Sequence, residues 1–162
     1  DVDFLIETHQ SNMHSIGGKP KEASFFNLIF SKEAKLDHKL YIAEIDGKKV
    51  AGLLLFYFNE TVEYFTPCTL YEFRNSQPSS LLIYEAMRDA VEDGFSFWNW
   101  GGTWEEQKGV YDFKKKWGAT DKKYYYYTKI FNEKITGLSI NNLLDLFPNF
   151  YTMPFKNLKT KL

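Results

Sequence analysis

The chain has 162 residues, of which 44% are hydrophobic, 19% aromatic and 25% charged. This composition suits one globular core and excludes intrinsic disorder, which needs few aromatic residues and an unbalanced charge. The formal net charge of -1 at pH 7 gives the chain as a whole no electrostatic attraction for duplex DNA, although a local basic face stays open.

The cysteine count and the apolar runs indicate the compartment. One cysteine, Cys68, cannot form an intrachain disulfide, so we expect a reducing compartment, the cytoplasm by default. The longest apolar run, 50–58, is far shorter than the ~20 residues of a membrane-spanning helix, and no basic-then-apolar leader opens the chain. We therefore expect no transmembrane segment. The start at Asp1, without a methionine, favours a processed product or a piece of a longer protein.

Helical spacing marks the first two predicted elements. Apolar residues recur at this spacing over 3–16, and a second helical pattern follows Pro20 over 21–33. His9 lies on the apolar stripe of the first segment without a second metal ligand one turn away. We therefore predict two helices that pack side by side and a structural role for this histidine.

From residue 40 the period changes to that of strands. The apolar runs 40–45 and 50–58 flank Asp46-Gly47, a dipeptide that suits the positive φ of a two-residue hairpin turn. The second run is apolar on both alternating faces, which predicts a central strand covered by helices on both sides. A third strand is expected over 61–66.

The second half of the chain alternates between helices and strands. The predicted elements are a helix over 79–93, a strand over 95–100, a helix over 105–117, a strand over 122–131 and a helix near 140–146. Together with the first half, this order predicts an α/β (α+β) fold with a mixed, mostly antiparallel sheet and helices on both faces.

A recognisable motif lies between residues 94 and 119. It consists of GFSFWNWGGT at 94–103, KGVYDFK at 108–114 and WGA at 117–119. With the element order over 3–131, these segments resemble the FemAB-like branch of the GNAT N-acetyltransferase fold superfamily. The resemblance departs from the family pattern at Asn99, where members often have an acid, and in the absence of the usual first strand.

The resemblance implies a fold, a domain and a reaction. It implies one acyltransferase-like domain over 1–162, with the C-terminal half of a longer FemAB-like protein as an open alternative. The implied reaction moves an acyl or aminoacyl group from aminoacyl-tRNA or acyl-CoA to an amine of a cell-wall peptide precursor or a surface-polysaccharide amino sugar. The implied partner is a small or lipid-linked cell-envelope precursor. Two alternatives stay open, namely a CoA-dependent GNAT N-acetyltransferase and a non-catalytic GNAT-fold binding module.

One turn discriminates between these donors. Acetyl-CoA enzymes of this fold bind the pyrophosphate with a glycine-rich turn at a helix N-terminus, where backbone amides approach the phosphates. The corresponding turn at 74–79 contains no glycine, and Pro78 removes one donor. We therefore predict weak or absent acetyl-CoA binding, although Arg74, Ser76 and Ser79 are candidates for phosphate contacts.

The substrate site is expected around Gly101-Gly102, where the resembled fold admits its donor or acceptor. Alternation along the preceding strand places Trp98 and Trp100 on one face and Asn99 on the other, and the tryptophans fit a core as well as an acceptor slot. The predicted substrate-binding residues are Arg74, Trp98, Asn99, Trp100, Gly101, Gly102, Thr103, Trp104 and Gln107.

The helix expected over 105–117 supplies the two predicted catalytic residues, Lys114 and Tyr111. Both lie on the shoulder of its apolar stripe, where a half-buried ammonium steadies a developing oxyanion or a phosphate. Lys115 and Lys116 are expected to be solvated. Tyr84 and Glu85 are further conceivable proton acceptors, beside Tyr111. The lone Cys68 has no activating neighbour in the sequence, so we expect an inert thiol.

Overall fold

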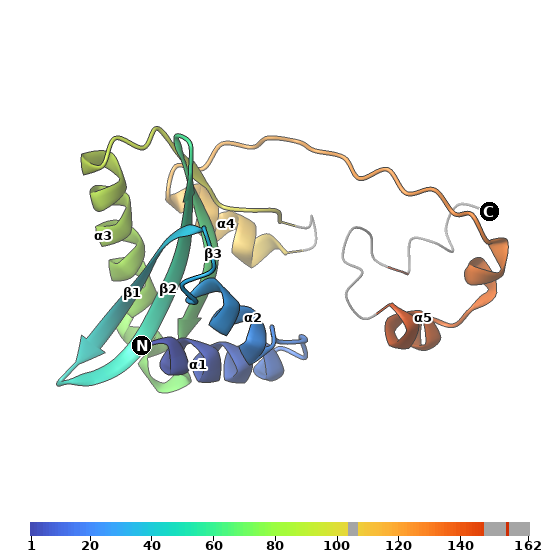
Figure 1. Ribbon diagram of the computed structural model, residues 1–162, viewed down its shortest axis with the longest axis horizontal. Coiled ribbons are helices and arrows are strands. Elements are labelled where there is room, and N and C mark those ends of the chain that lie inside the picture. Colours follow the sequence, from blue (N-terminus) through green and yellow to red (C-terminus); the bar gives the residue numbers. More distant parts are fainter. Residues whose placement is uncertain (104–106, 148–154, 156–162) are drawn as a thin grey trace. The chain divides into compact units, whose positions relative to one another are not determined.

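The computed structural model describes residues 1–103, 107–147 and 155 (Figure 1). Its contacts divide the chain into two compact units, Asp1–Ala119 and Thr120–Leu162, which are described separately below. The single acyltransferase-like domain expected over 1–162 stays a prediction. Among the described helices, none combines the length and the apolar character that crossing a bilayer requires.

The first unit is built on a four-stranded sheet in the order β1-β2-β3-β4. The strands are β1 (Asp37–Ile45), β2 (Lys48–Phe58), β3 (Thr61–Thr69) and β4 (Phe97–Asn99). The first three strands pair antiparallel, and β4 runs parallel to β3. The mixed, mostly antiparallel sheet is thereby confirmed, with β2 between two partners as the apolar run predicted.

Two tight turns connect the antiparallel strands. Asp46 and Gly47 adopt φ values of 51° and 75° between β1 and β2, as a two-residue turn with positive φ requires. Asn59 takes φ 51° between β2 and β3. Aspartate, asparagine and glycine tolerate this left-handed region better than other residues do, so the sequence determines both turns locally.

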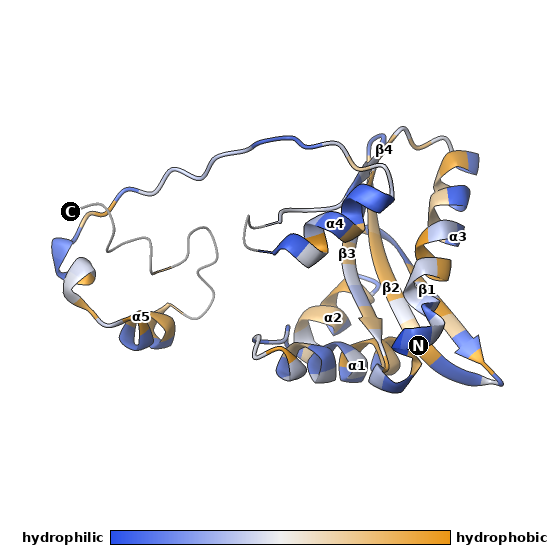
Figure 2. Ribbon diagram, turned by 180° about the vertical axis from the view of Figure 1, so that it is seen from behind, coloured by the Kyte–Doolittle hydropathy of each residue, from blue (hydrophilic) through white to orange (hydrophobic). Residues whose placement is uncertain are grey.

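Helices cover both faces of the sheet, as predicted (Figure 1). On one face, α1 (Val2–Ser15) and α2 (Ala23–Ile29) pack against Leu54. On the other face, α3 (Pro78–Glu92) packs against Leu53 and Leu55, and α4 (Lys108–Lys116) adds apolar side chains to that cluster. The central residues of β2 are buried, and the strand is mostly hydrophobic in the colours of Figure 2.

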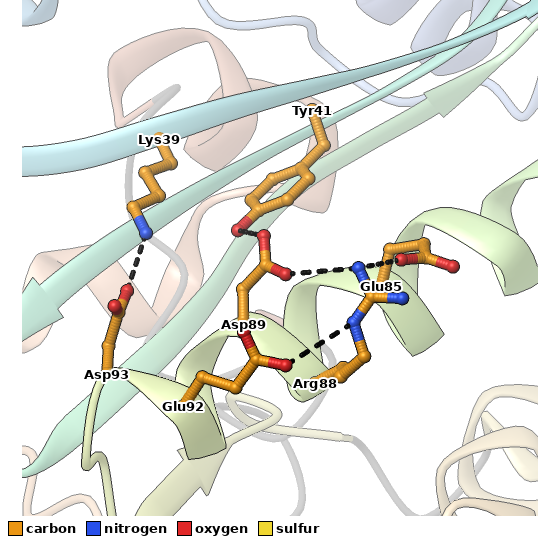
Figure 3. A network of polar contacts seen from close by, with 7 residues as sticks. All are labelled: Lys39, Tyr41, Glu85, Arg88, Asp89, Glu92 and Asp93. Carbon is orange, nitrogen blue, oxygen red and sulfur yellow. Dashed lines mark hydrogen bonds and ion pairs between the residues drawn. The ribbon is translucent and has the colours of Figure 1, made fainter.

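Polar contacts at the surface tie β1 to α3 (Figure 3). Lys39 forms an ion pair of 2.7 Å with Asp93, and the Tyr41 hydroxyl donates to Asp89 at 3.0 Å. Glu85, one of the conceivable proton acceptors, forms an ion pair with Arg88 in the same network. Exposed pairs of this kind contribute at most about 1 kcal/mol each, so the apolar layers carry most of the packing energy.

The second unit contains two short helical elements, the 3₁₀ helix η2 (Glu133–Gly137) and α5 (Ile140–Leu146). The Ser139 hydroxyl caps α5 by accepting the Asn142 amide at 3.1 Å, and the helix predicted near this position is confirmed. The strand predicted over 122–131 is wrong, because these residues form no strand ladder. Tyrosine-rich sequence favours a strand only where a neighbouring strand pairs with its backbone.

Candidate active site

The strands β3 and β4 pair over three residues, and the pairing ends where β4 ends, at Asn99. Their parallel register runs from Thr61 opposite Phe97 to Glu63 opposite Asn99, while β3 continues to Thr69. The second half of β3 therefore pairs with β2 but forms no ladder with β4. On the side away from β2, the part of β3 beyond Glu63 therefore carries no strand ladder among the described residues.

A pocket of about 650 Å³ lies where β3 ends, beside the first turn of α3 and the last turn of α4. The residues that line it are Asn12, Pro67, Cys68, Thr69, Arg74, Gln77, Pro78, Ser79, Ser80, Phe113, Lys116 and Trp117. Two of these are cations, Arg74 and Lys116, and none is acidic. The pocket thus combines a helix N-terminus with positive side chains, which is the environment that binds phosphate groups.

The turn into α3 forms without glycine. Gln77 takes φ 52° in the left-handed region directly before Pro78, the first residue of the helix. A glycine at this position would serve the same conformation. The absence of glycine between 74 and 79 therefore does not prevent the turn, although Pro78 supplies no amide donor to a bound phosphate.

Polar contacts fix the floor of the pocket. The side-chain amide of Asn12 donates to the carbonyl of Thr69 at 2.9 Å, and the Thr69 amide donates to the Asn12 oxygen at 3.0 Å. The hydroxyls of Thr69 and Ser79 share a further hydrogen bond. These contacts join α1, the end of β3 and the start of α3, so the pocket is bounded by three elements held in one arrangement.

A second polar cluster lies where β3 and β4 are still paired. The Asn99 side chain donates to a carboxylate oxygen of Glu63 at 2.6 Å and accepts the Gly101 amide at 3.0 Å. Burial raises the pKa of the Glu63 carboxyl, while the Asn99 hydrogen bond and the Lys114 charge oppose this rise. A carboxylate with a raised pKa accepts protons more readily than an exposed one does, so Glu63 is a candidate general base.

The predicted catalytic lysine belongs to this cluster. The Lys114 ammonium donates to the carbonyls of Gly101 at 3.3 Å and Gly102 at 3.2 Å, and to the Thr103 hydroxyl at 2.8 Å. Burial lowers the pKa of Lys114, and the charge of Glu63 opposes that shift. The predicted contrast is confirmed, because Lys114 is half-buried while its two lysine neighbours on α4 are exposed. In this arrangement Lys114 holds the segment that follows β4.

The remaining predicted residues lie in other places. Trp98 and Trp100 project from the opposite face to Asn99 and pack with Tyr64, whose ring centroid lies 4.9 Å from that of Trp100. This aromatic cluster corresponds to the core role that the sequence left open for the tryptophans, and their substrate contacts stay a prediction. Trp104 lies outside the described residues.

The two other residues predicted on this helix, Gln107 and Tyr111, lie directly before it and on its exposed side. Gln107 precedes the helix, and its carbonyl accepts the Tyr111 amide at 3.0 Å. The Tyr111 ring is 40% exposed and lies 5.8 Å from the Lys115 ammonium. Their catalytic and binding roles stay predictions.

Sequence reasoning did not find Glu63. The available signal was a single acidic residue in the middle of a predicted strand, but its partner Asn99 is 36 positions away.

The two residues expected to be chemically inert, Cys68 and His9, are indeed buried. Burial raises the pKa of the Cys68 thiol to about 12 and lowers that of His9 to about 4, with the Lys21 charge adding to the second shift. Among the described residues, no group of three His, Cys, Asp or Glu side chains forms a metal site.

Residues 1–115 match the family model of the acetyltransferase (GNAT) domain. The chain belongs to this family. No curated protein matches it in sequence. The match supports the superfamily part of the resemblance, while the FemAB-like branch, with its aminoacyl-tRNA donor and peptidoglycan acceptor, is not supported by it.

Solved GNAT structures share the fold. An acetyltransferase from Clostridium acetobutylicum, solved with acetyl-CoA, is 14% identical with a TM-score of 0.59, over 80% of this chain and 90% of that one. An aminoglycoside acetyltransferase from an uncultured soil sample, in complex with sisomicin, is 14% identical with a TM-score of 0.58 over the same shares, 80% and 90%. A ribosomal-protein-alanine N-acetyltransferase from Brucella melitensis is 12% identical with a TM-score of 0.61, over 80% and 92%.

Proposed function

We propose that the protein is a CoA-dependent GNAT N-acetyltransferase that moves an acetyl group from acetyl-CoA to a primary amine. The observation that carries this proposal is the pocket at the start of α3, lined by Arg74 and Lys116 and by no acidic residue. Its cations and the helix N-terminus complement the phosphates of CoA. A solved structure of the same fold adds support, since that predicted acetyltransferase was solved with acetyl-CoA.

The strand β3 connects the phosphate pocket to the proposed general base. Pro67 lines the pocket, and Glu63 lies four residues earlier on the same strand, about 13 Å away at the rise of a β-strand. An elongated donor is therefore needed to join the two places. Acetyl-CoA has this shape, because a flexible arm separates its phosphates from its thioester.

The proposed reaction proceeds by direct transfer. The acceptor arrives as an ammonium ion and gives one proton to the Glu63 carboxylate, which Asn99 orients. The neutral amine then attacks the thioester carbonyl, so that a carbon–nitrogen bond forms and the carbon–sulfur bond breaks. The CoA thiolate leaves and takes up the second proton, which the attacking nitrogen loses as the amide forms, and Glu63 returns the first proton to solvent. Positioning of the two substrates supplies much of the rate in such a mechanism.

Calorimetry with acetyl-CoA tests the proposal. We expect the wild-type chain to bind in the micromolar range and Lys116→Glu to weaken binding by about tenfold, or ~1.4 kcal/mol, through loss of one phosphate contact. The matched control is Lys115→Glu, which makes the same charge change on α4 outside the pocket lining and should change the Kd less than about twofold.

Two results would count against the proposal. Absence of acetyl-CoA binding by the wild-type chain would overturn it, and equal effects of the two substitutions would remove the pocket from the donor site. Amide formation from aminoacyl-tRNA but not from acetyl-CoA would restore the FemAB-like hypothesis, including its cell-wall or amino-sugar acceptor.

A further inference from the structure

Glu63 has one apolar and one polar neighbour across the sheet. Glu63 stands opposite Phe56 on β2 and opposite Asn99 on β4, so these side chains form one row across three strands. Directly paired residues of neighbouring strands project from the same face. The carboxylate therefore has a phenylalanine on one side and its hydrogen-bonded asparagine on the other.

More phenylalanines lie on the same face. The next row towards the end of β2 consists of Phe58, Thr61 and Phe97, each two residues along its strand from a member of the first row. In the other direction, the ring centroid of Phe65 lies 4.5 Å from that of Phe56. We call Phe56, Phe58, Phe65 and Phe97 the phenylalanine surface.

The phenylalanine surface is only partly covered by the helices of its face. Phe58 is 77% exposed and Phe97 is 63% exposed, on either side of Thr61. Exposed large rings that gather beside a half-buried carboxylate indicate a binding surface, which apolar residues scattered singly over a protein do not. A ligand that covers these rings and also presents a cation to Glu63 would satisfy both features.

Positive charges border the same surface. The Lys21 ammonium lies 4.9 Å from the ring centroid of Phe65, and Lys114 lies close enough to Glu63 to oppose the rise of its pKa. Both cations repel further positive charges on a bound ligand, and Lys114 also weakens the attraction of Glu63 for the first ammonium. The surface therefore suits one ammonium group at Glu63 and an uncharged body beyond it.

We infer that the acceptor of the proposed acetyl transfer is a monoamine whose amino group is carried on an apolar or aromatic body that packs on the phenylalanine surface. This inference rests on the proposed function, since it assigns the acceptor side of the same site. Burial of the rings against the acceptor body and pairing of its ammonium with Glu63 are the two sources of affinity. Polycationic amines lack the apolar body, and their further charges meet Lys21 and Lys114.

The first experiment measures acceptor preference with the full chain and acetyl-CoA. Release of the CoA thiol and the product mass are followed with 2-phenylethylamine, glucosamine and sisomicin as acceptors. We expect kcat/KM for 2-phenylethylamine to exceed the other two by at least about tenfold, the scale of discrimination by an apolar contact. A preference for glucosamine or sisomicin would overturn the inference while leaving the proposed transferase intact.

The second experiment tests the surface without the donor. Calorimetry measures 2-phenylethylamine binding to the wild type, to Phe97→Ser and to the control Phe131→Ser, which removes a ring that is 86% exposed in the second unit. We expect about tenfold weaker binding for Phe97→Ser and an unchanged Kd for the control, with both variants folded by circular dichroism. Equal binding by all three proteins, or no binding by any, would overturn the inference. Amine binding with no acetyl-CoA binding would instead overturn the proposed donor.

Discussion

Removal of the Lys114 ammonium tests whether the segment after β4 must be held in place for activity. In Lys114→Met the apolar stem is kept while the three hydrogen bonds to Gly101, Gly102 and Thr103 are lost. Only the bond to Thr103, at 2.8 Å, is short, while the other two are 3.2 and 3.3 Å. A buried charged hydrogen bond contributes about 1.5–3 kcal/mol, and partial solvation of Lys114 reduces this, so we expect a total loss of about 1–2 kcal/mol in the free energy of unfolding.

The effect on catalysis should be larger than the effect on stability. If Lys114 positions this segment or stabilises developing charge, kcat/KM for acetyl transfer should fall by about a hundredfold, the scale of one lost transition-state contact. Lys115→Met removes the same charge from an exposed position on α4 and should change neither quantity measurably. Urea denaturation and steady-state rates measure the two effects, and Lys114→Arg should restore part of both. Equal and small effects of the two methionine substitutions would mean that Lys114 belongs to a solvated cluster.

Three further predictions concern pH and the core. Burial, and then the Lys21 charge, lower the pKa of His9 from 6.5 to about 4, so the unfolded chain takes up this proton first as the pH falls. The contribution of neutral His9 to the free energy of unfolding should be complete above pH 6.5 and should fall by about 3 kcal/mol towards pH 4. Urea titrations at several pH values measure this fall, and an equally steep fall in His9→Gln would contradict the prediction. Because burial raises the pKa of Glu63 above 4.5, kcat/KM should rise with pH along an acid limb above that value, and Glu63→Gln should abolish the limb and lower kcat/KM by about a hundredfold. Leu54→Ala should cost about 2–5 kcal/mol of unfolding free energy because Leu54 is fully buried under α1 and α2. The control Leu36→Ala, at a position 53% exposed, should cost less than about 0.5 kcal/mol. Similar urea midpoints for the two variants would refute this contrast.

Local patterns predicted most of the first unit. The doubly apolar run of β2 predicted its central place in the sheet, and Asp46-Gly47 predicted the turn before it. The helical period also separated the half-buried Lys114 from the exposed Lys115. Each of these features depends on residues within a few positions of one another, whose spacing alone determines which face they share.

The same local patterns failed where a feature depended on a partner. The tyrosine run at 122–131 has the composition of a strand, yet strand formation requires a neighbouring backbone, which no local pattern specifies. The absence of glycine from 74–79 predicted a poor phosphate-binding turn, but Gln77 adopts the left-handed conformation that glycine favours.

The candidate site depends on tertiary structure more than the order of helices and strands does. The motif at 94–103 located Asn99 and Gly101, but Glu63 joins them only because β3 and β4 pair in parallel across 36 positions of sequence. The contact between Asn12 and Thr69 spans 57 positions and helps to form the pocket at the start of α3. The sequence by itself therefore determined which segments of the first unit form helices and strands, because periodicity and turn chemistry are local. The tertiary structure alone decided which polar groups meet, because strand pairing and packing bring together residues that carry no mutual signal along the chain.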